Sequence, residues 1–248
     1  MKMFDLTGQK AIVTGVGSPR GLGRSIALGL REAGAKVAVI SRSARVFDIA
    51  REDGFLAGQA DLTDRAQLEQ VFADLVAQLG TLDILINNHG MTFVHEAESV
   101  PLEIWDRMLS TNLGTVFHLC QLGGRIMLRK GYGKIINMAS VMSFSGGNKI
   151  PAYAASKGGL AQLTKALANE WIGRGINVNA IAPGLIETEM TEGIKNNPAR
   201  RDYFASRMPI GRFGRPDDVQ GTAIFLASHA SDFISGAIIP VDGGFLSS

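Results

Sequence analysis

A serine, a tyrosine and a lysine in the second half of the chain have types and spacing suited to proton transfer at a carbonyl group. Tyr153 and Lys157 stand four residues apart, a spacing that places both side chains on one face of a helix. Tyrosine has an ordinary pKa of about 10, and an adjacent ammonium favours its phenolate form, so Lys157 could lower the pKa of Tyr153 towards the working range. Ser140 could hold a carbonyl oxygen while Tyr153 donates to it. The alternative is a surface tyrosine with a lysine beside it.

The predicted elements bring these residues to one edge of a sheet. The strand predicted over residues 134–139 ends at Ser140, and Tyr153 stands at the start of a helix predicted over 151–174. Another helix is predicted over 101–129, where apolar residues recur at steps of three and four, and Asn112 falls inside this apolar stripe. A buried amide needs partners, so Asn112 either satisfies backbone groups as a structural device or holds a water or a catalytic group.

A glycine-rich turn follows the first predicted strand and opens a helix predicted over 21–33. It runs from Thr14 through Gly15, Gly21 and Gly23. Glycines at these places allow a tight turn, close approach of a pyrophosphate to the backbone, and packing of the helix on the strand. The spacing departs from GxGxxG because Arg20 occupies the place of the third glycine, so the turn alone is weak evidence for nucleotide binding.

Strand and helix alternate along the chain. Apolar runs predict buried strands at 10–14, 36–41, 55–59, 82–86, 134–139, 177–181 and 237–241, and helical spacing is found at 21–33, 64–79, 101–129, 151–174 and 216–227. This order predicts an α/β fold, a doubly wound parallel sheet with helices on both faces, in a single domain over residues 1–248. The stretch 43–60 is weakly patterned. The polar insertion at 187–208 is predicted to be a lid beyond the carboxyl ends of the strands, with an ordinary surface loop as the alternative.

Composition narrows the class of protein. The 248 residues are 46% hydrophobic and 19% charged, which excludes a disordered chain because so much apolar material can form a core. The single cysteine, Cys120, excludes an intramolecular disulfide, and it is expected to be a small buried side chain in a cytoplasmic protein.

Several kinds of partner are not expected. No apolar run approaches the roughly 18 residues that span a bilayer, so no membrane partner is predicted. The formal net charge is +2 and the basic residues form no long cluster, which argues against nucleic acid. His95, His118 and His229 lack metal-ligand spacing, so no catalytic metal is expected.

Together these motifs resemble the short-chain dehydrogenase/reductase family over nearly the whole chain. The resemblance is carried by the glycine-rich turn, by Asn112, Ser140, Tyr153 and Lys157, and by Asp61-Leu62, Asn87-Asn88-His89-Gly90, Pro183-Gly184 and Val241-Asp242-Gly243-Gly244. It implies a Rossmann-type domain with a seven-stranded parallel sheet. It also implies hydride transfer between a nicotinamide cofactor and a carbonyl or secondary alcohol.

The resemblance implies a role for each matching residue. Tyr153 would exchange the proton, and Lys157 would bind the nicotinamide ribose and tune that tyrosine. Ser140 would orient the substrate, and Asn112 would anchor a water in the proton relay. With the residues that follow the second strand added, the candidate cofactor contacts are Gly15, Ser18, Arg20, Gly21, Leu22, Gly23, Ser41, Arg42, Ser43, Asp61, Leu62, Asn88, Gly90, Tyr153, Lys157, Pro183, Gly184, Ile186 and Thr188.

Two departures from the family pattern stand out. The first turn usually reads TGxxxGxG, whereas five residues separate Gly15 from Gly21, so the phosphate loop is two residues longer. His89 stands where the family usually has alanine in NNAG. It is either a benign substitution that points away from the cofactor or a side chain that contacts the active site.

The residues after the second strand bear on the choice of cofactor. A carboxylate there would bind the ribose hydroxyls of NAD, but the chain reads Ser41-Arg42-Ser43. Arg42 could pair with the additional phosphate of NADP through its planar fork, and Arg20 could approach the same group. NADP(H) is therefore the preferred cofactor, with NAD(H) possible. The alternative is that Arg42 stacks on adenine and both cofactors bind.

The substrate is expected to be a small carbonyl compound or alcohol. Segments 139–147 and 168–171 look like those of gluconate 5-dehydrogenases and dehydrogenases of keto-deoxy sugar acids, whose substrates carry a carboxylate. That carboxylate could be bound by Lys149 or by the basic residues of the lid, Lys195, Arg200, Arg201 and Arg207, although these equally fit a solvated basic face.

The same residues leave three other functions open, and the resemblance also bears on the oligomeric state. The alternatives are a reductase of 3-oxoacyl thioesters on an acyl carrier protein, a broad carbonyl reductase, or a cofactor-bound structural or regulatory protein without turnover. The resemblance also implies a homotetramer built on the helices at 101–129 and 151–174.

Overall fold

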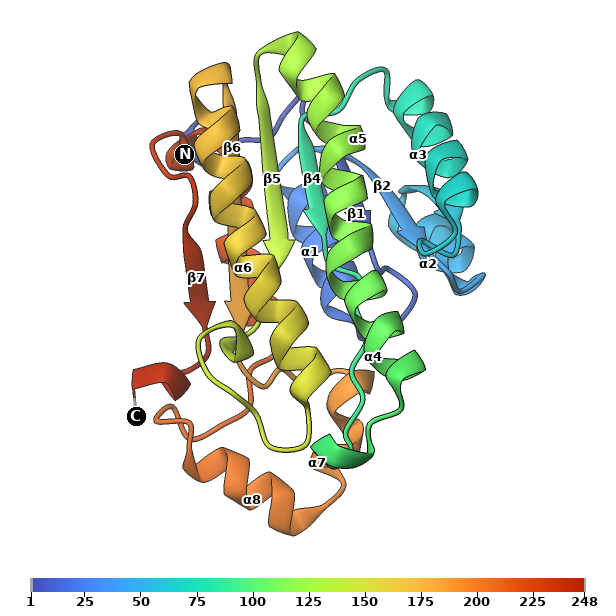
Figure 1. The fold of residues 1–248 in the computed structure, drawn as a ribbon. Coiled ribbons are helices and arrows are strands. Elements are labelled where there is room, and N and C mark those ends of the chain that lie inside the picture. The colour runs from blue at the N-terminus through green and yellow to red at the C-terminus, as the bar shows by residue number, and fades with distance from the viewer. Residues whose placement is uncertain (1, 248) are drawn as a thin grey trace.

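Seven parallel strands form one sheet within residues 2–247, the part of the chain that the computed structural model describes, the side chains of Lys2, Lys195 and Arg200 excepted. Their order is β3-β2-β1-β4-β5-β6-β7 (Figure 1). The strands are β1 Lys10–Thr14, β2 Lys36–Ser41, β3 Leu56–Gln59, β4 Ile84–Asn87, β5 Gly133–Met138, β6 Ile176–Pro183 and β7 Ile238–Val241. In this order β2 and β3 lie outward from β1, and β5, β6 and β7 lie outward from β4 on the other side. Parallel sheets of this kind bind ligands in the crevice beyond the carboxyl ends of the two central strands.

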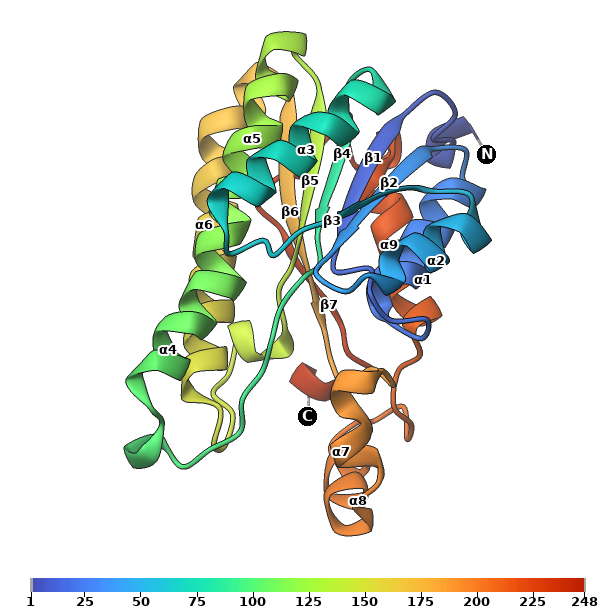
Figure 2. The ribbon, with the colours of Figure 1, turned by 90° about the vertical axis from the view of Figure 1, so that its right-hand side faces the viewer.

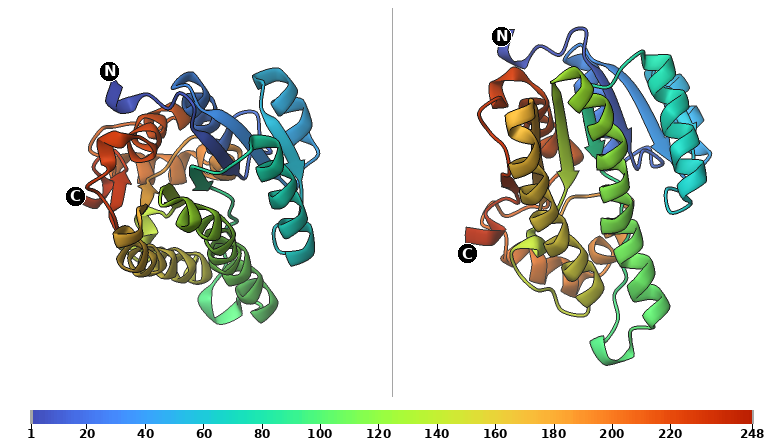
Figure 3. Two further views of the ribbon diagram at one scale, coloured as in Figure 1. Left: turned by 90° about the horizontal axis from the view of Figure 1, so that it is seen from above. Right: turned by 45° about the horizontal axis from the view of Figure 1, so that its top comes forward.

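Helices cover both faces of the sheet (Figures 2 and 3). One layer consists of α1 Leu22–Glu32, α2 Arg45–Asp53 and α9 Pro216–Ala227, and the other of α3 Arg65–Leu79, α5 Thr115–Lys130 and α6 Pro151–Trp171. Neighbouring strand residues serve opposite layers, because side chains alternate along a strand: Val13 packs with α1, and Ile12 packs with α3 and α5. Such strands are apolar on both faces, as the sequence predicts for a buried parallel sheet. The doubly wound Rossmann-type fold is confirmed.

Three local elements differ from the sequence expectations. Residues 45–53 form α2, although the weakly patterned stretch predicted no helix there. The single helix predicted over 101–129 consists of α4 Leu102–Leu109 and α5, joined by a π-helical turn over Ser110–Gly114. The insertion at 187–208 contains α7 Glu192–Lys195 and α8 Pro198–Ser206, which extend beyond the carboxyl ends of the strands (Figure 2).

Two further expectations concern burial and membranes. Cys120 is fully buried on α5 and lies within 3.3 Å of the Asn87 amide nitrogen, as expected for a small buried side chain. Burial raises the pKa of its thiol to about 12. Among the described residues, no helix is long and apolar enough to cross a bilayer.

Candidate active site

The candidate catalytic residues come together at the carboxyl edge of the sheet. Ser140 directly follows the loop residue after β5, and α6 starts at Pro151 and carries Tyr153 and Lys157 back along β5 and β6. Proline at the first helical position suits this start because its missing N–H has no intrahelical role there. Three segments distant in sequence thus converge here: the residues after β4, the residues after β5, and the first turns of α6.

Ser140, Tyr153 and Lys157 are held by each other and by the backbone. The Tyr153 hydroxyl is hydrogen-bonded to Ser140, whose Oγ also accepts from the Met142 N–H at 3.1 Å. Lys157 Nζ donates to the Met138 carbonyl at 2.6 Å and lies 5.8 Å from the centre of the Tyr153 ring. A hydroxyl pair beside a fixed ammonium can bind a carbonyl oxygen and exchange a proton with it.

Burial controls the proton affinities of this group. It raises the pKa of Tyr153, and the hydrogen bond from Ser140 only partly offsets this. The expectation that Lys157 lowers the pKa of Tyr153 below its ordinary value is therefore wrong for the cofactor-free chain. Burial also lowers the pKa of Lys157 to about 8. Near neutral pH, the tyrosine is a neutral proton donor and the lysine is an ammonium.

Asn112 lies on the π-turn and is fully buried. Its Oδ1 accepts from the Met91 N–H at 2.9 Å, and its Nδ2 donates to the Met91 carbonyl at 2.9 Å and to Ser156 Oγ at 3.1 Å. Of the two interpretations of this amide, its contacts favour the structural device. The side chain clamps the segment after β4 against the π-turn and α6, and so holds the floor of the site.

The glycine loop between β1 and α1 presents groups that suit a phosphate. Gly15 has a φ of +76°, and a Cβ there would lie 2.8 Å from the His89 Cα, so only glycine fits. Gly21 is the N-cap residue of α1 and has no side chain that could accept a hydrogen bond. The first N–H groups of the helix therefore receive no hydrogen bond from the capping residue's side chain. Ser18 Oγ is buried and has no hydrogen-bond partner among the residues that the structure describes. Open N–H groups and an unpartnered hydroxyl at a helix start are the donors that a pyrophosphate accepts from.

The residues that follow β2 lie against the glycine loop, and those that follow β3 come next along the edge of the sheet. Ser41 Oγ accepts from the Ser43 N–H at 3.2 Å and faces Gly17, whose Cβ, if present, would clash with it. Arg42 is exposed, and its carbonyl accepts from Gln59 Nε2 at 3.0 Å. The Thr63 hydroxyl and N–H donate to the Asp61 carboxylate and lower its pKa, with Arg42 adding a smaller effect.

Arg20 makes a contact that the sequence did not predict. It was expected beside the same phosphate as Arg42, but its guanidinium pairs with Glu192 of α7 at 2.6 Å, with 76% of the Arg20 side chain exposed. The longer glycine loop therefore reaches the insertion at 187–208. Leu22 and Gly23 start α1, and a Cβ on Gly23 would lie 2.8 Å from the Gly15 carbonyl oxygen.

The remaining candidate cofactor residues stand at or just after the carboxyl ends of β3, β4 and β6. Asn88 Nδ2 donates to the Thr14 carbonyl at 3.0 Å, and a Cβ on Gly90 would lie 3.7 Å from Lys157 Nζ. Leu62 is buried after β3. Pro183 ends β6, Gly184 and Ile186 follow it, and the Thr188 N–H donates to Thr191 Oγ1 at 3.0 Å.

Three of the basic residues considered for a substrate carboxylate have protein partners: Lys149, Arg201 and Arg207. Lys149, which has a φ of +62°, pairs with Glu96 at 2.5 Å. Arg201 pairs with its neighbour Asp202, and the Arg207 guanidinium lies 5.0 Å from the centre of the Phe245 ring. The side chains of Lys195 and Arg200 lie outside the described residues. Within the part of the chain that is described, no group of three His, Cys, Asp or Glu side chains could hold a metal ion.

His89 is buried beside the candidate catalytic residues. Thr14 Oγ1 lies 2.8 Å from its Nδ1, and only 9% of the residue is exposed. Burial, helped by the positive charge of Lys157, lowers the pKa of His89 to about 4, so the ring is neutral near neutral pH. The ring of His89 therefore contacts Thr14 and lies near enough to Lys157 to be affected by its charge.

Some residues that shape the site gave no signal in the sequence. Met91 contributes its backbone to the Asn112 clamp, and the Ser143 hydroxyl donates to the Lys157 carbonyl at 2.7 Å. Thr14 was recognised only as part of the glycine turn, yet its hydroxyl accepts from the Asn88 N–H at 3.0 Å. Most of these contacts use backbone groups, which residues of every type carry. Such contacts become visible only once the fold has brought the segments together.

Known proteins are similar to this chain over its full length. A family model described as Enoyl-(Acyl carrier protein) reductase matches residues 15–246. The 2-dehydro-3-deoxy-D-gluconate 5-dehydrogenase of Bacillus subtilis is 44% identical over 98% of this chain and 97% of its own length. The gluconate 5-dehydrogenase of Gluconobacter oxydans is 38% identical over 98% of this chain and 96% of its own. A solved gluconate 5-dehydrogenase from Burkholderia cenocepacia, in complex with NADP and tartrate, has a TM-score of 0.93 at 38% identity and covers 100% and 98% of the two chains.

Proposed function

Because the chain belongs to the short-chain dehydrogenase/reductase family, we propose that it interconverts a secondary alcohol and a ketone on a sugar acid or keto-deoxy sugar acid, with NADP(H) as the preferred cofactor and NAD(H) as a possible one. The observation that carries this proposal is the Tyr153 hydroxyl bonded to Ser140, with Lys157 beside its ring, at the carboxyl edge of the sheet. The relatives that act on gluconate or on 2-dehydro-3-deoxy-gluconate support the substrate class.

The side chains have complementary tasks in the reduction direction. Bound nicotinamide supplies the hydride that reaches the carbonyl carbon. Ser140 and Tyr153 hold the carbonyl oxygen, and Tyr153 gives its proton to that oxygen as the C–H bond forms. The phenolate left on Tyr153 is stabilised by the Lys157 ammonium and regains a proton from solvent. In oxidation each transfer runs backwards, with Tyr153 accepting the alcohol proton.

The residues at this edge of the sheet suit a dinucleotide with an additional phosphate. Ser18 and the open start of α1 would hold the pyrophosphate, and Asp61 and Leu62 would border the adenine. Arg42, with Ser41 and Ser43 beside it, would bind the phosphate on the adenosine ribose, where a carboxylate would repel it.

One assay tests the reaction class and the substrate together. Purified protein is supplied with both cofactors and with a sugar acid, a neutral ketone and a 3-oxoacyl thioester, and nicotinamide absorbance is followed. We expect the sugar acid to have the highest kcat/KM, and Tyr153→Phe to lower kcat by about a thousandfold or more while cofactor still binds. A dominant rate on the thioester would favour the acyl-carrier reductase, and cofactor binding with no turnover would favour a protein without catalysis.

Lys149 is the proposed partner of the substrate carboxylate. Its side chain is 45% exposed and pairs with Glu96, an ion pair that is open to exchange with a bound anion. We expect Lys149→Ala to raise the KM for a sugar acid about tenfold and to leave a neutral ketone unaffected, because a bridging ion pair is lost only for the acid. Lys165→Ala, an exposed lysine on α6, is the matched control. Equal losses on both substrates would remove Lys149 from this role.

Further proposals concern the lid, the assembly and the compartment. The single domain over 1–248 would use residues 187–208 as a substrate-binding lid, supported by the Arg20 contact to Glu192. A homotetramer would bury apolar side chains of α4 and α5 such as Leu102 and Phe117, which are 75% and 42% exposed. Light scattering on the purified protein tests the tetramer, and fractionation of cells tests the cytoplasmic location.

A further inference from the structure

The motif Val241-Asp242-Gly243-Gly244 at the end of β7 forms a tight turn that has no part in the proposed reaction. Gly243 and Gly244 have φ values of +62° and +89°, which glycine adopts far more readily than other residues. The Asp242 carboxylate accepts from the N–H of Gly244 at 3.0 Å and from the N–H of Leu246 at 2.9 Å. The motif therefore fixes the direction that the chain takes after β7.

This turn directs Phe245 into a small apolar cluster that lies apart from the two main layers of the core. Phe245 is only 7% exposed. The other buried members of the cluster are Val141, Met208 and Phe213. The cluster thus joins three segments that are distant in the sequence: the residues after β5, the end of the insertion at 187–208 with the residues that follow it, and the turn after β7.

The end of the insertion and the turn after β7 are also held together by direct contacts (Figures 1 and 2). The Ile210 N–H donates to the Gly243 carbonyl at 3.1 Å, and a Cβ on Gly243 would lie 2.5 Å from the Ile210 side chain. The Arg207 guanidinium lies 5.0 Å from the centre of the Phe245 ring, within the range of a cation–π contact. Phe245 is therefore fixed from both sides, by its own turn and by the insertion.

The cluster reaches the candidate catalytic residues through Val141, which directly follows Ser140. Val141 opens a 3-10 turn, Val141–Ser143, and the N–H of Met142 in this turn donates to Ser140 Oγ at 3.1 Å. One support of the turn is the Ser143 hydroxyl, which donates to the Lys157 carbonyl at 2.7 Å. Its second support is the packing of Val141 in the cluster that contains Phe245.

We propose that Phe245 is a positioning residue for Ser140: through the cluster it holds the turn at 141–143, and so the N–H that fixes the Ser140 hydroxyl. In the proposed reaction Ser140 contacts the substrate, whereas Phe245 acts only through Ser140. The place of that hydroxyl matters because a displacement of about 1 Å can cost about a hundredfold in rate. The effect on catalysis rests on the proposed dehydrogenase function, whereas the support of the turn does not.

Hydrogen exchange on the full chain tests the support without any turnover. We expect Phe245→Ala to speed amide exchange over residues 141–145 by about tenfold or more, because hydrogen bonds open more often where packing is lost. The amides of β1 should exchange as in the wild type. Phe233→Ala, which removes a fully exposed phenylalanine from the turn before β7, is the matched control and should change neither segment. Unchanged exchange over 141–145 in Phe245→Ala would overturn the proposal.

A double-mutant cycle shows whether Phe245 acts through Ser140. We expect Phe245→Ala to lower kcat by about tenfold to a hundredfold and to leave the Kd of NADPH within about twofold. In the Ser140→Ala background the same change should cost less than about twofold, because no hydroxyl is left to position. Equal losses in the two backgrounds would show that Phe245 supports the fold in general and would contradict its role as a positioning residue.

A conservative variant separates loss of packing from other effects. Phe245→Met keeps most of the apolar volume, so it should restore the exchange over 141–145 and bring kcat to within about threefold of the wild type. A methionine variant as impaired as Phe245→Ala would contradict packing as the cause. If Phe245→Ala does not fold, Phe245→Val takes its place in both experiments, with smaller losses expected. The expected exchange pattern in a chain that reduces no carbonyl compound would overturn the proposed function and leave this inference standing.

Discussion

At the residue scale, the choice of cofactor depends on the short segment that follows β2. Ser41-Arg42-Ser43 contains one cation and no carboxylate. The Arg42 side chain is exposed, and its carbonyl accepts a hydrogen bond from Gln59. Arg20 pairs with Glu192 instead, which leaves Arg42 as the guanidinium proposed for the additional phosphate. A single side chain therefore carries most of the expected discrimination.

Replacing Arg42 should weaken NADP more than NAD. We expect Arg42→Ala to lower kcat/KM for NADP by about tenfold to a hundredfold, the range for one charge-assisted contact to a phosphate, and to change the value for NAD little. Steady-state kinetics with the two cofactors measures this. Arg45→Ala, an exposed arginine at the start of α2, serves as the control for a general change of charge. Similar losses with both cofactors would indicate that Arg42 stacks on adenine.

At the element scale, the π-turn between α4 and α5 is the feature that shapes the floor of the site. A continuous α-helix over 101–129 would carry Asn112 in an apolar stripe, and the wider turn over Ser110–Gly114 lets its amide reach Met91 and Ser156. Such turns occur mostly as single insertions at functional places. The helix thereby fixes the segment after β4, which carries His89 and Gly90.

Removing the Asn112 amide should destabilise the fold as well as the site. Asn112→Ala leaves the N–H and carbonyl of Met91 without this partner in a partly buried setting, which should lower the free energy of unfolding by about 1 to 3 kcal/mol. Urea unfolding at fixed protein concentration measures the change. Asn148→Ala, an exposed asparagine in the loop before α6, should have almost no effect. A loss below about 0.5 kcal/mol would mean that Met91 finds other partners.

The elements also explain how far the sequence could be interpreted. Ser140, Tyr153 and Lys157 could be placed together because strand ends in a parallel sheet share one edge and helix residues four apart share one face. In α2, the buried positions Val46, Ile49 and Ala50 have helical spacing, but the exposed Phe47 and the charged residues between them obscure the pattern. The π-turn, the Met91 clamp and the pairing of Arg20 with Glu192 depend on contacts between distant segments, for which residue types carry no signal.

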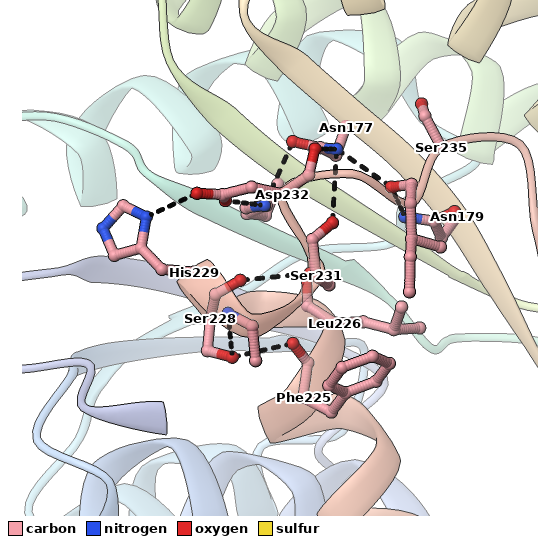
Figure 4. A network of polar contacts seen from close by, with 12 residues as sticks. Asn177, Asn179, Phe225, Leu226, Ser228, His229, Ser231, Asp232 and Ser235 are labelled. Atoms are coloured by element: carbon pink, nitrogen blue, oxygen red, sulfur yellow. Dashed lines mark hydrogen bonds and ion pairs between the residues drawn. The ribbon is translucent and has the colours of Figure 1, made fainter. Parts of the chain in front are cut away.

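At the scale of the whole molecule, the two ends of the sheet have different tasks. The carboxyl edge carries the site, and the opposite edge is held by a polar network around β5, β6 and the turn before β7 (Figure 4). Lys134, the second residue of β5, is fully buried, and its Nζ donates to Asn177 Oδ1 at 3.0 Å and to Asp232 at 2.7 Å. Asn177 Nδ2 donates in turn to the carbonyls of Asp232 and Ile234. The network ties residues about a hundred positions apart, far along the strands from Ser140.

Changes in this network should alter stability without altering the chemistry. Asp232→Ala leaves the buried Lys134 ammonium without its carboxylate, whereas Lys134→Met leaves an Asp232 side chain that is 56% exposed and can be solvated. We therefore expect Asp232→Ala to cost about 3 kcal/mol of unfolding free energy and Lys134→Met clearly less, because an unpaired buried charge costs more than an exposed one. Urea unfolding provides the comparison, and kcat should stay unchanged in both variants.

The pH dependence of the stability of Asp232→Ala independently checks the expectation that this variant loses more unfolding free energy than Lys134→Met does. Burial lowers the pKa of Lys134 below its ordinary value, although its hydrogen bond to Asp232 works in the opposite direction. The folded chain therefore binds fewer protons at Lys134 than the unfolded chain does, so stability rises with pH between the folded pKa and the ordinary lysine value of about 10.4. Without the carboxylate the folded pKa falls further, and the deficit of Asp232→Ala should shrink as the solution is made alkaline. A loss of unfolding free energy that stays constant with pH would contradict this expectation. It would show that removing Asp232 costs only one hydrogen bond, and that the Lys134 ammonium then finds another partner or water.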